Sequence, residues 1–423
     1  MTDSPASGRT HAAAPVAAAA PLSFRVEATC GAARAGRLEL AHGVVETPVF
    51  MPVGTRAAMR GLTPAELERL GVQIVLSNTY HLMLRPGESI IQKAGGLHRF
   101  MGWPHPVLTD SGGYQVFSLQ KTEVSDHGVR FRWEESGEPV LLTPERSMEV
   151  QQALGADIAM AFDECAPYPC TEAQAAAAVR RTRLWAARSR AAHARPDQAL
   201  FGIVQGSVYR ALREESARDV AALDFPGHAI GGLSVGEGLQ AMCEVLDYTA
   251  PLLPADRPRY LMGIGFPADV VEAVARGIDM MDCVIPTRLA RGASLFTRRG
   301  RIRVTDRSYA RDLYPVDAGC ACYTCTNFSR AYLRHLFLSD EILGTILGAL
   351  HNVAFYMDLM KEVRASIRDG TFATVRAKWQ AMDGTPRGTA ARAEGAGPPA
   401  GGPPPRVSAS PRRAGRGGRR KRS

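Results

Sequence analysis

The chain has 423 residues, 45% of them hydrophobic, and a formal net charge of +9. This length and apolar content exclude a wholly disordered or fibrous protein and are enough for one large α/β domain or two smaller ones. Residues 1–23 are rich in Ala and Pro but lack the basic flank and long apolar run of a secretion signal or membrane span, so we expect a disordered leader.

After this leader the chain repeats one pattern, a short apolar run followed by a helical stretch. Eight runs end in small or polar residues and predict strands at 48–54, 73–78, 106–111, 157–164, 200–206, 229–234, 259–263 and 277–286. Helical patterns lie between them at 63–70, 144–154, 172–194, 209–223, 239–252 and 267–276, the first with Thr63 as N-cap before Pro64. Eight strand–helix units predict an α/β fold, a (β/α)8 TIM barrel over residues 24–384, with a doubly wound open sheet as the alternative.

In such a barrel the active site lies where the strands end. Three predicted strands end in aspartates, Asp110, Asp163 and Asp282. Helix caps use the same residue types, so one position alone means little. Three carboxylates that converge on one mouth could serve as nucleophile, general acid/base and substrate anchor. No phosphate-binding glycine loop and no His-x-His on the first strand is present, so the sequence indicates neither a nucleotide cofactor nor a barrel hydrolase of that type.

Three cysteines lie within six residues near the carboxyl end of the chain, Cys320, Cys322 and Cys325. With one histidine they would make a closed Cys3His site for a structural Zn2+ ion, one per subunit, in an insertion at about residues 300–352. From spacing alone the histidine could be His335 or His351. The other cysteines are scattered, which favours a reducing compartment, the cytoplasm.

The positive charge is confined to the end of the chain. Residues 385–423 hold ten basic residues and one acidic residue, so the rest of the chain is neutral. This tail is rich in Pro, Gly, Ala and Arg, and we expect it to be disordered, with either weak RNA affinity or no function.

Several segments over residues 24–379 resemble the bacterial queuine tRNA-ribosyltransferases, also called tRNA-guanine transglycosylases. They are VVETPVFMPVGT, LSNTYHL, LTDSGGYQVFSL, AFDECAPYP, FGIVQGSVY, IGGLSVGEG, YLMGIG, GIDMMDCVIPTR and CYTCTNFSRAYLRHL. The resemblance implies a TIM barrel with a zinc-binding insertion and selects His351 as the fourth ligand. It also implies exchange of the wobble guanine of tRNAs with GUN anticodons for 7-aminomethyl-7-deazaguanine, in queuosine biosynthesis.

The resemblance also assigns roles to residues. Asp282 would be the nucleophile that holds the ribose covalently, and Asp110 the general acid/base. The substrate base would contact Asp110, Ser111, Tyr114, Asp163, Cys165, Gln205, Gly231, Gly232, Leu233, Val235 and Met262. RNA would contact Arg288 and Arg291. The family implies a homodimer with no membrane association, and the alternatives are a non-catalytic tRNA-binding subunit or a metal-dependent barrel hydrolase.

Overall fold

The computed structural model describes residues 20–117, 119, 122–133 and 135–381. The predicted tail from residue 385 lies outside the described residues, as does the predicted leader up to residue 19. Ser23, the last residue assigned to the leader, is the first residue of a strand.

Eight parallel strands form the central sheet, in the order β4-β14-β13-β12-β11-β10-β6-β5. A parallel bridge between Val53 and Leu76 brings the two edges together, and the Gly54 N–H donates to Leu76 O at 2.7 Å. The predicted TIM barrel is therefore confirmed, and each strand overlaps its predicted range. The bounds are β4 Val49–Pro52, β5 Val75–Ser77, β6 Val107–Thr109, β10 Ile158–Met160, β11 Ala199–Val204, β12 Gly227–Ile230, β13 Arg259–Leu261 and β14 Met280–Cys283.

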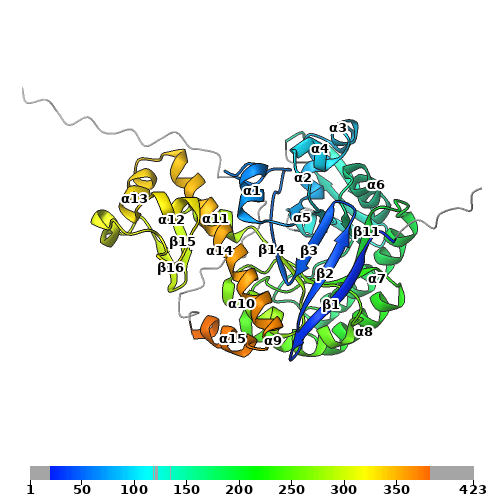
Figure 1. Cartoon of the computed structure of the whole chain (residues 1–423). Coiled ribbons are helices and arrows are strands. Elements are labelled where there is room, and N and C mark those ends of the chain that lie inside the picture. The colour runs from blue at the N-terminus through cyan, green and yellow to red at the C-terminus, as the bar shows by residue number, and fades with distance from the viewer. Residues whose placement is uncertain (1–19, 118, 120–121, 134, 382–423) are drawn as a thin grey trace, which may run out of the picture.

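Helices follow the strands and surround the barrel (Figure 1). The predicted cap of the first helix is present: Thr63 and Glu66 form a capping box, and Pro64 opens the helix. The helices are α1 Pro64–Leu70, α2 Thr79–Leu84, α3 Glu88–Lys93, α4 Leu97–Met101, α5 Gly113–Phe117, α6 Pro144–Leu154, α7 Glu172–Ala192, α8 Arg210–Ala222, α9 Gly238–Thr249, η1 Ala250–Leu252, α10 Pro267–Ala275, α11 Ile285–Arg291, η2 Arg307–Arg311, α12 Tyr323–Asn327, α13 Arg330–Leu338, α14 Ile342–Arg368 and α15 Phe372–Ala381.

Three antiparallel sheets were not predicted. One of them, in blue in Figure 1, covers the amino ends of the barrel strands, where its Arg34 bonds to Asp279 and its turn residue His42 bonds to Asp157. The other two lie in the insertion after α5 and in the region before the cysteine cluster. Their strands are β1 Ser23–Cys30, β2 Ala33–Leu40 and β3 Gly43–Thr47; β7 Glu123–Ser125, β8 Gly128–Arg132 and β9 Pro139–Leu142; and β15 Ser294–Thr297 and β16 Gly300–Arg303.

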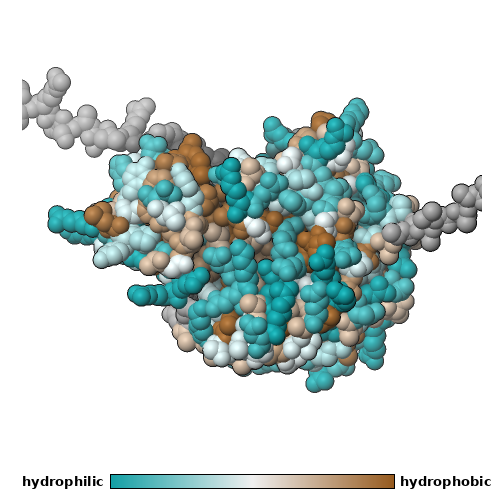
Figure 2. All heavy atoms as spheres, in the orientation of Figure 1, coloured by the Kyte–Doolittle hydropathy of each residue, from teal (hydrophilic) through white to brown (hydrophobic). Residues whose placement is uncertain are grey.

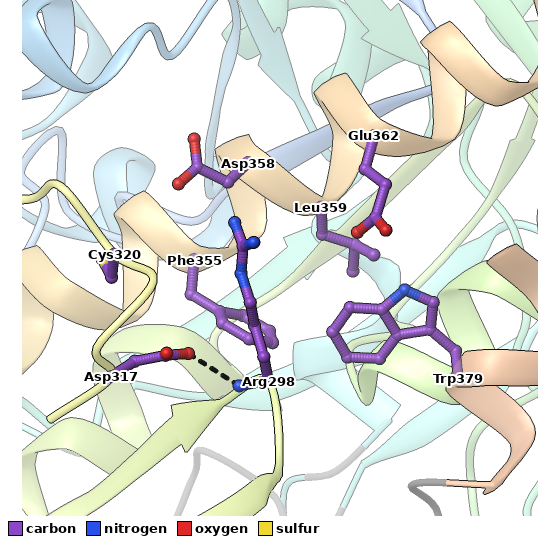
Figure 3. A pocket seen from close by; sticks show the side chains of 8 residues that line it. All are labelled: Arg298, Asp317, Cys320, Phe355, Asp358, Leu359, Glu362 and Trp379. Atoms are coloured by element: carbon purple, nitrogen blue, oxygen red, sulfur yellow. Dashed lines mark hydrogen bonds between the residues drawn. The ribbon is translucent and has the colours of Figure 1, made fainter.

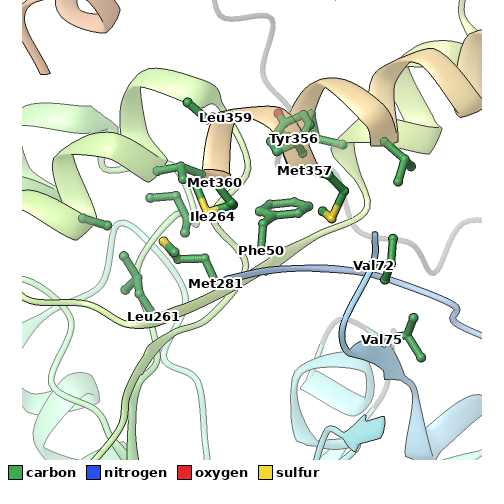
Figure 4. Close-up of a cluster of buried hydrophobic side chains, with 14 of the residues drawn as sticks. Phe50, Val72, Val75, Leu261, Ile264, Met281, Tyr356, Met357, Leu359 and Met360 are labelled. Carbon is green, nitrogen blue, oxygen red and sulfur yellow. The ribbon is translucent and has the colours of Figure 1, made fainter. Parts of the chain in front are cut away.

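The long helix α14 joins the cysteine-cluster region to the barrel. Figure 4 shows Phe50 of β4 against this helix, and the Phe50 and Tyr356 ring centroids lie 4.4 Å apart. By length and composition α14 could cross a membrane, but 72% of its most apolar window is buried within the protein. It therefore has the character of a core helix, whose burial drives packing of the two parts on each other.

Candidate active site

Asp110 lies directly after β6 and is buried. Its carboxylate accepts hydrogen bonds from the side chains of Asn78 and Gln115 and, at 2.8 Å, from the Thr79 N–H. Burial is the main cause that raises the pKa of Asp110 to about 7, and the nearby charge of Asp282 raises it further. A carboxyl group with a pKa near neutrality can both give and accept a proton at physiological pH, as a general acid/base requires.

Asp282 lies on β14, across the mouth, and is half-buried. The Tyr260 hydroxyl and the Gly263 N–H, at 2.5 and 2.8 Å, both donate to Oδ1. Burial raises the pKa of Asp282, and these two bonds oppose the rise by favouring the ionised form. Because both donors hold Oδ1, Oδ2 is the oxygen available to attack an electrophile.

Asp163 forms the floor of the site together with two polar neighbours. Ser111 Oγ donates to its Oδ1 at 3.1 Å, and Gln205 Nε2 donates to its Oδ2 at 2.7 Å. Burial raises the pKa of Asp163 to about 6, so it is mostly ionised at neutral pH. The Gln205 Oε1 atom is buried without a hydrogen-bond partner among the described residues. Such a polar floor is suited to a planar ligand that carries both donors and acceptors on one edge.

The other predicted base contacts come from the loops around this floor. Gly232 has a φ of 65°, and a Cβ there would lie 2.3 Å from Gln205 Oε1, so only glycine fits. Tyr114 on α5 is 48% exposed, as a stacking surface would be, and Met262 directly follows β13. Gly231, Leu233 and Val235 follow β12, while Cys165 lies two residues after Asp163 and burial raises the pKa of its thiol to about 12.

Four residues that support this site were not predicted from the sequence. Thr79, Gln115 and Tyr260 hold the two outer aspartates, and Arg213 lies beneath the loops after β11 and β12. The spacing of Arg213 is a signal that the sequence does contain. It precedes Ser216, Ala217 and Val220 by three, four and seven positions and so shares their helix face, which the structure shows to be buried.

Arg288 and Arg291, predicted to bind RNA, lie in the last turn of α11, which begins two residues after β14 ends. The neighbouring chain from β15 to η2 carries further exposed arginines. Arg298 lines a hollow with Asp317, Asp358 and Glu362, and we call the other four, Arg299, Arg303, Arg307 and Arg311, the hairpin arginines. The rest of the described chain pairs many of its arginines with acids, whereas none of these four forms an ion pair among the described residues. Their charge is available to a polyanion.

The three predicted cysteines meet His351 in one cluster, in which the four donor atoms all lie within 4.8 Å of one another. His351 Nδ1 lies 3.9, 3.5 and 3.3 Å from the sulfur atoms of Cys320, Cys322 and Cys325. Its other ring nitrogen, Nε2, lies 2.7 Å from Phe296 O, which fixes the proton on Nε2 and leaves Nδ1 free to bind a metal. His335 instead contacts Ser339. The cluster can therefore hold one metal ion through four protein ligands.

A second group of metal-binding residue types, His42, His98 and Asp157, lies at the amino ends of the strands. The two imidazole rings are stacked at 3.5 Å with an interplanar angle of 15°. One ion cannot lie in both ring planes when the rings are parallel, so this geometry does not suit a metal. Each ring instead contacts a different oxygen of Asp157 at 2.9 Å, as hydrogen bonds do.

A small hollow lies beside the cysteine cluster, between β15 and helices α14 and α15 (Figure 3). Its lining mixes Arg298 with Asp317, Asp358 and Glu362 around Phe355 and Trp379. The Arg298 N–H donates to Asp317 Oδ2 at 2.7 Å. None of the three strand-end aspartates lines this hollow, and we interpret it as the joint between the cluster region and the barrel.

Comparison with known proteins agrees with this geometry. The family model of queuine tRNA-ribosyltransferase matches residues 29–384. The chain is 57% identical over 356 residues to a queuine tRNA-ribosyltransferase of Pelotomaculum thermopropionicum, covering 84% of this chain and 96% of the relative. It is 55% identical over 372 residues to that of Symbiobacterium thermophilum, covering 86% and 93%. For that of Thiobacillus denitrificans, identity is 54% over 361 residues, covering 85% and 98%.

Proposed function

Since the chain belongs to the queuine tRNA-ribosyltransferase family, we propose that it acts as a tRNA-guanine transglycosylase. It exchanges the wobble guanine of tRNAs with GUN anticodons for 7-aminomethyl-7-deazaguanine, a step of queuosine biosynthesis. The single observation that carries the mechanism is that Asp110 and Asp282 both lie at the carboxyl ends of parallel barrel strands, β6 and β14, and so at the same mouth.

The exchange proceeds in two displacements at the ribose. Asp282 Oδ2 attacks the anomeric carbon while the bond to guanine breaks and Asp110 gives its proton to the departing base. The incoming base then loses a proton to Asp110, and its nitrogen displaces Asp282 from the same carbon. Two inversions retain the configuration of the ribose, and no nucleotide cofactor is needed.

The polar floor recognises the base. Asp163, ionised at neutral pH, accepts from the ring N–H and the adjacent amino group that guanine and its 7-deaza analogue share. Gln205 and the Gly232 N–H donate to the carbonyl oxygen, and Ser111 keeps Asp163 oriented. Tyr114 and Met262 stack on the ring, while Leu233, with Cys165 and Val235 beside it, receives the aminomethyl group.

The RNA lies along the positive surface next to this mouth. Arg288 and Arg291 contact the nucleotides beside the wobble base, and the hairpin arginines contact phosphates further along the backbone. The anticodon loop is already single-stranded, so turning its wobble base into the pocket costs little.

The Cys3His cluster holds a structural Zn2+ ion, one per subunit. Its donor set is the one zinc prefers, and the four donor atoms all lie within 4.8 Å of one another. With four protein ligands no position is open for substrate, so the ion ties α12 to α14 and takes no part in base exchange.

A homodimer is the assembly we propose. Several large apolar residues on the cluster side are exposed, including Leu313 at 80% and Ile342 at 76%, with Tyr314, Tyr323 and Leu338. Figure 2 shows brown apolar atoms on this part of the surface. A second copy would cover them. None of the eight cysteines, all of which lie in the described part of the chain, forms a disulfide. This supports a reducing compartment, and with a tRNA substrate we place the enzyme in the cytoplasm.

The test is exchange of labelled guanine into a cognate tRNA by the wild type and by Asp282→Asn. We expect exchange by the wild type and none by the variant, with Asp279→Asn, at the other end of the same strand, as the matched control. Full exchange by Asp282→Asn would overturn the mechanism. A wild type that binds tRNA without exchanging guanine would favour the non-catalytic subunit. The hydrolase alternative is disfavoured because, within the described residues, both groups with metal-binding side chains lie away from the mouth.

A further inference from the structure

Arg213 is a charged residue with no exposed surface, in the first turn of α8. Burial lowers the pKa of its guanidinium to about 10, so it stays protonated at neutral pH. The recorded partners of its nitrogens are four backbone carbonyl oxygens: Ser207 O at 2.7 Å, Val204 O at 3.1 Å, Gly231 O at 2.7 Å and Gly232 O at 3.2 Å. A buried cation is costly to desolvate, and backbone dipoles offset that cost only where they converge as they do here.

The four carbonyls belong to the carboxyl end of β11 and to the two loops that form the polar floor. Val204 and Ser207 flank Gln205, and Gly231 and Gly232 open the loop after β12. Ser207 has a φ of 50°, an uncommon conformation for a residue with a side chain, and its carbonyl receives the Nε–H of Arg213. One rigid, planar group thus ties both loops to the same helix.

The hydrogen bond from Arg213 to Gly231 O determines the direction of the Gly232 N–H. The peptide bond between Gly231 and Gly232 is planar and trans, so its carbonyl and its N–H point in opposite directions. Because Arg213 holds the Gly231 carbonyl from beneath the loop, the Gly232 N–H points away from Arg213, toward the thiol of Cys165, which lies two residues after Asp163. The Gln205 side chain packs directly against Gly232, as the 2.3 Å approach to a hypothetical Cβ shows.

We propose that Arg213 is the positioning residue of the base pocket: it orients the Gly232 N–H and holds Gln205 so that both donate to the carbonyl oxygen of the base. Arg213 does not touch the base. It supplies the selectivity for a purine with a carbonyl at that ring position over one without it. This inference rests on the proposed base exchange and adds the source of its specificity.

The test compares guanine with 2-aminopurine, which lacks the carbonyl oxygen, as competitive inhibitors of labelled-guanine exchange. 2-Aminopurine also lacks the ring N–H beside that carbonyl, from which Asp163 accepts, so the ratio of the two inhibition constants measures recognition of both groups. Only the carbonyl part of the ratio should respond to Arg213, and the ratio does not depend on how much enzyme is folded. We expect Arg213→Met to shrink this ratio by about tenfold, the loss of one to two well-placed hydrogen bonds. The control is Arg364→Met, another buried arginine, which donates to Pro48 O at 2.9 Å at the opposite end of the barrel. It should keep the wild-type ratio.

Arg213→Lys gives a second reading if the methionine variant does not fold. A lysine keeps the charge but cannot donate to carbonyls of both loops in the planar geometry of a guanidinium, so the ratio should still fall. Added guanidinium should restore part of the ratio in Arg213→Ala. A wild-type ratio in Arg213→Lys or Arg213→Met contradicts the inference alone, whereas a wild type that exchanges no guanine contradicts the proposed function itself.

Discussion

Strand β10 is flanked by two aspartates, and the two carboxylates are held in opposite ways. On the amino side, burial would raise the pKa of Asp157, but hydrogen bonds from His98, the Val107 N–H and His42 outweigh it, and the pKa is lowered. On the carboxyl side, Asp163 accepts from the neutral donors Ser111, Gln205 and its own backbone N–H, and burial raises its pKa to about 6. One carboxylate is satisfied by the fold, and the other is left available to a ligand.

Strand β14 repeats the contrast in hydrogen-bond partners, although burial raises the pKa of both of its aspartates. Asp279, at its amino end, forms an ion pair with Arg34 and accepts the Arg259 N–H at 2.7 Å. Asp282, toward its carboxyl end, has Tyr260 and the Gly263 N–H as its recorded donors, both neutral. Aspartates thus hold the structure together at the amino ends of the barrel strands and are available to a ligand at the carboxyl ends. Carboxylates kept without a cation cost stability, as is common in active sites.

The largest expected effect is at the reactive end. Asp110→Asn should lower kcat about 10²–10⁴-fold, because the departing base is no longer protonated. The wild type should lose activity as pH rises through about 7, where Asp110 gives up its proton. Quenched-flow measurement of guanine release across the neutral pH range checks both points. A variant that retains the same alkaline decline would show that another group is the acid.

Asp157→Ala tests the closed end. The change strands two histidines and two backbone N–H groups, and we expect it to lower the free energy of unfolding by about 3 kcal/mol while kcat per folded enzyme stays unchanged. The wild-type contribution should be present above the unfolded pKa of an aspartate, about 3.9, and be lost as pH falls through the lower folded pKa. Urea unfolding at neutral pH and at pH values below that range measures it. A fall in kcat of the fully folded variant would contradict the claim that Asp157, at the amino end of the barrel, serves stability alone.

Asp163→Asn should separate binding from stability. Without the ionised acceptor, the KM for the base should rise about 10-fold or more. The folded pKa of about 6 lies above the unfolded value, so ionisation of Asp163 costs stability at pH values above this range. The melting temperature of the variant should therefore exceed that of the wild type at mildly alkaline pH and match it where Asp163 is protonated. A variant less stable than the wild type at mildly alkaline pH would contradict the interpretation that ionised Asp163 costs stability.

The smallest expected effect is on the RNA surface. Arg299→Gln with Arg303→Gln should reduce the slope of log affinity against log salt by about 1 for each phosphate that the variant no longer neutralises. The KM for the free base should not change, because both residues lie on the β15–β16 hairpin, away from the floor. The slope is measured by fluorescence anisotropy with an anticodon stem-loop at salt concentrations on both sides of about 0.15 M, the physiological ionic strength. An Arg25→Gln variant, exposed on the sheet at the other end, is the control.

Sequence patterns predicted the barrel well because each strand is a short apolar run that ends in polar residues. They missed the sheet β1–β3, whose first strand contains no apolar run. Exposed and half-buried residues alternate along β1. The bonds from His42 and His98 to Asp157 could not be predicted either, since the residues they join are 115 and 59 positions apart.

In the candidate site, too, residues with a local sequence pattern could be predicted and contacts between distant residues could not. Asp110, Asp163 and Asp282 could be found because they end strands, and the cysteines because they are close together in the chain. The fourth metal-binding residue was open between His335 and His351 on spacing, since only α14 and its packing on α12 decide which imidazole faces the sulfur atoms. Tyr260 and Gln115 carry no local signal, because a buried tyrosine or a helix glutamine is common in any fold.

Mapping the covalent intermediate tests most directly whether Asp282 is the nucleophile. An anticodon stem-loop RNA incubated with enzyme, then denatured and digested, should yield one peptide that carries the ribose-linked RNA on Asp282, as mass spectrometry would show. We expect this adduct in the wild type and in Asp279→Asn, and none in Asp282→Asn. An adduct on Asp110 or Asp163, or one that persists in Asp282→Asn, would contradict the assignment of the nucleophile to β14.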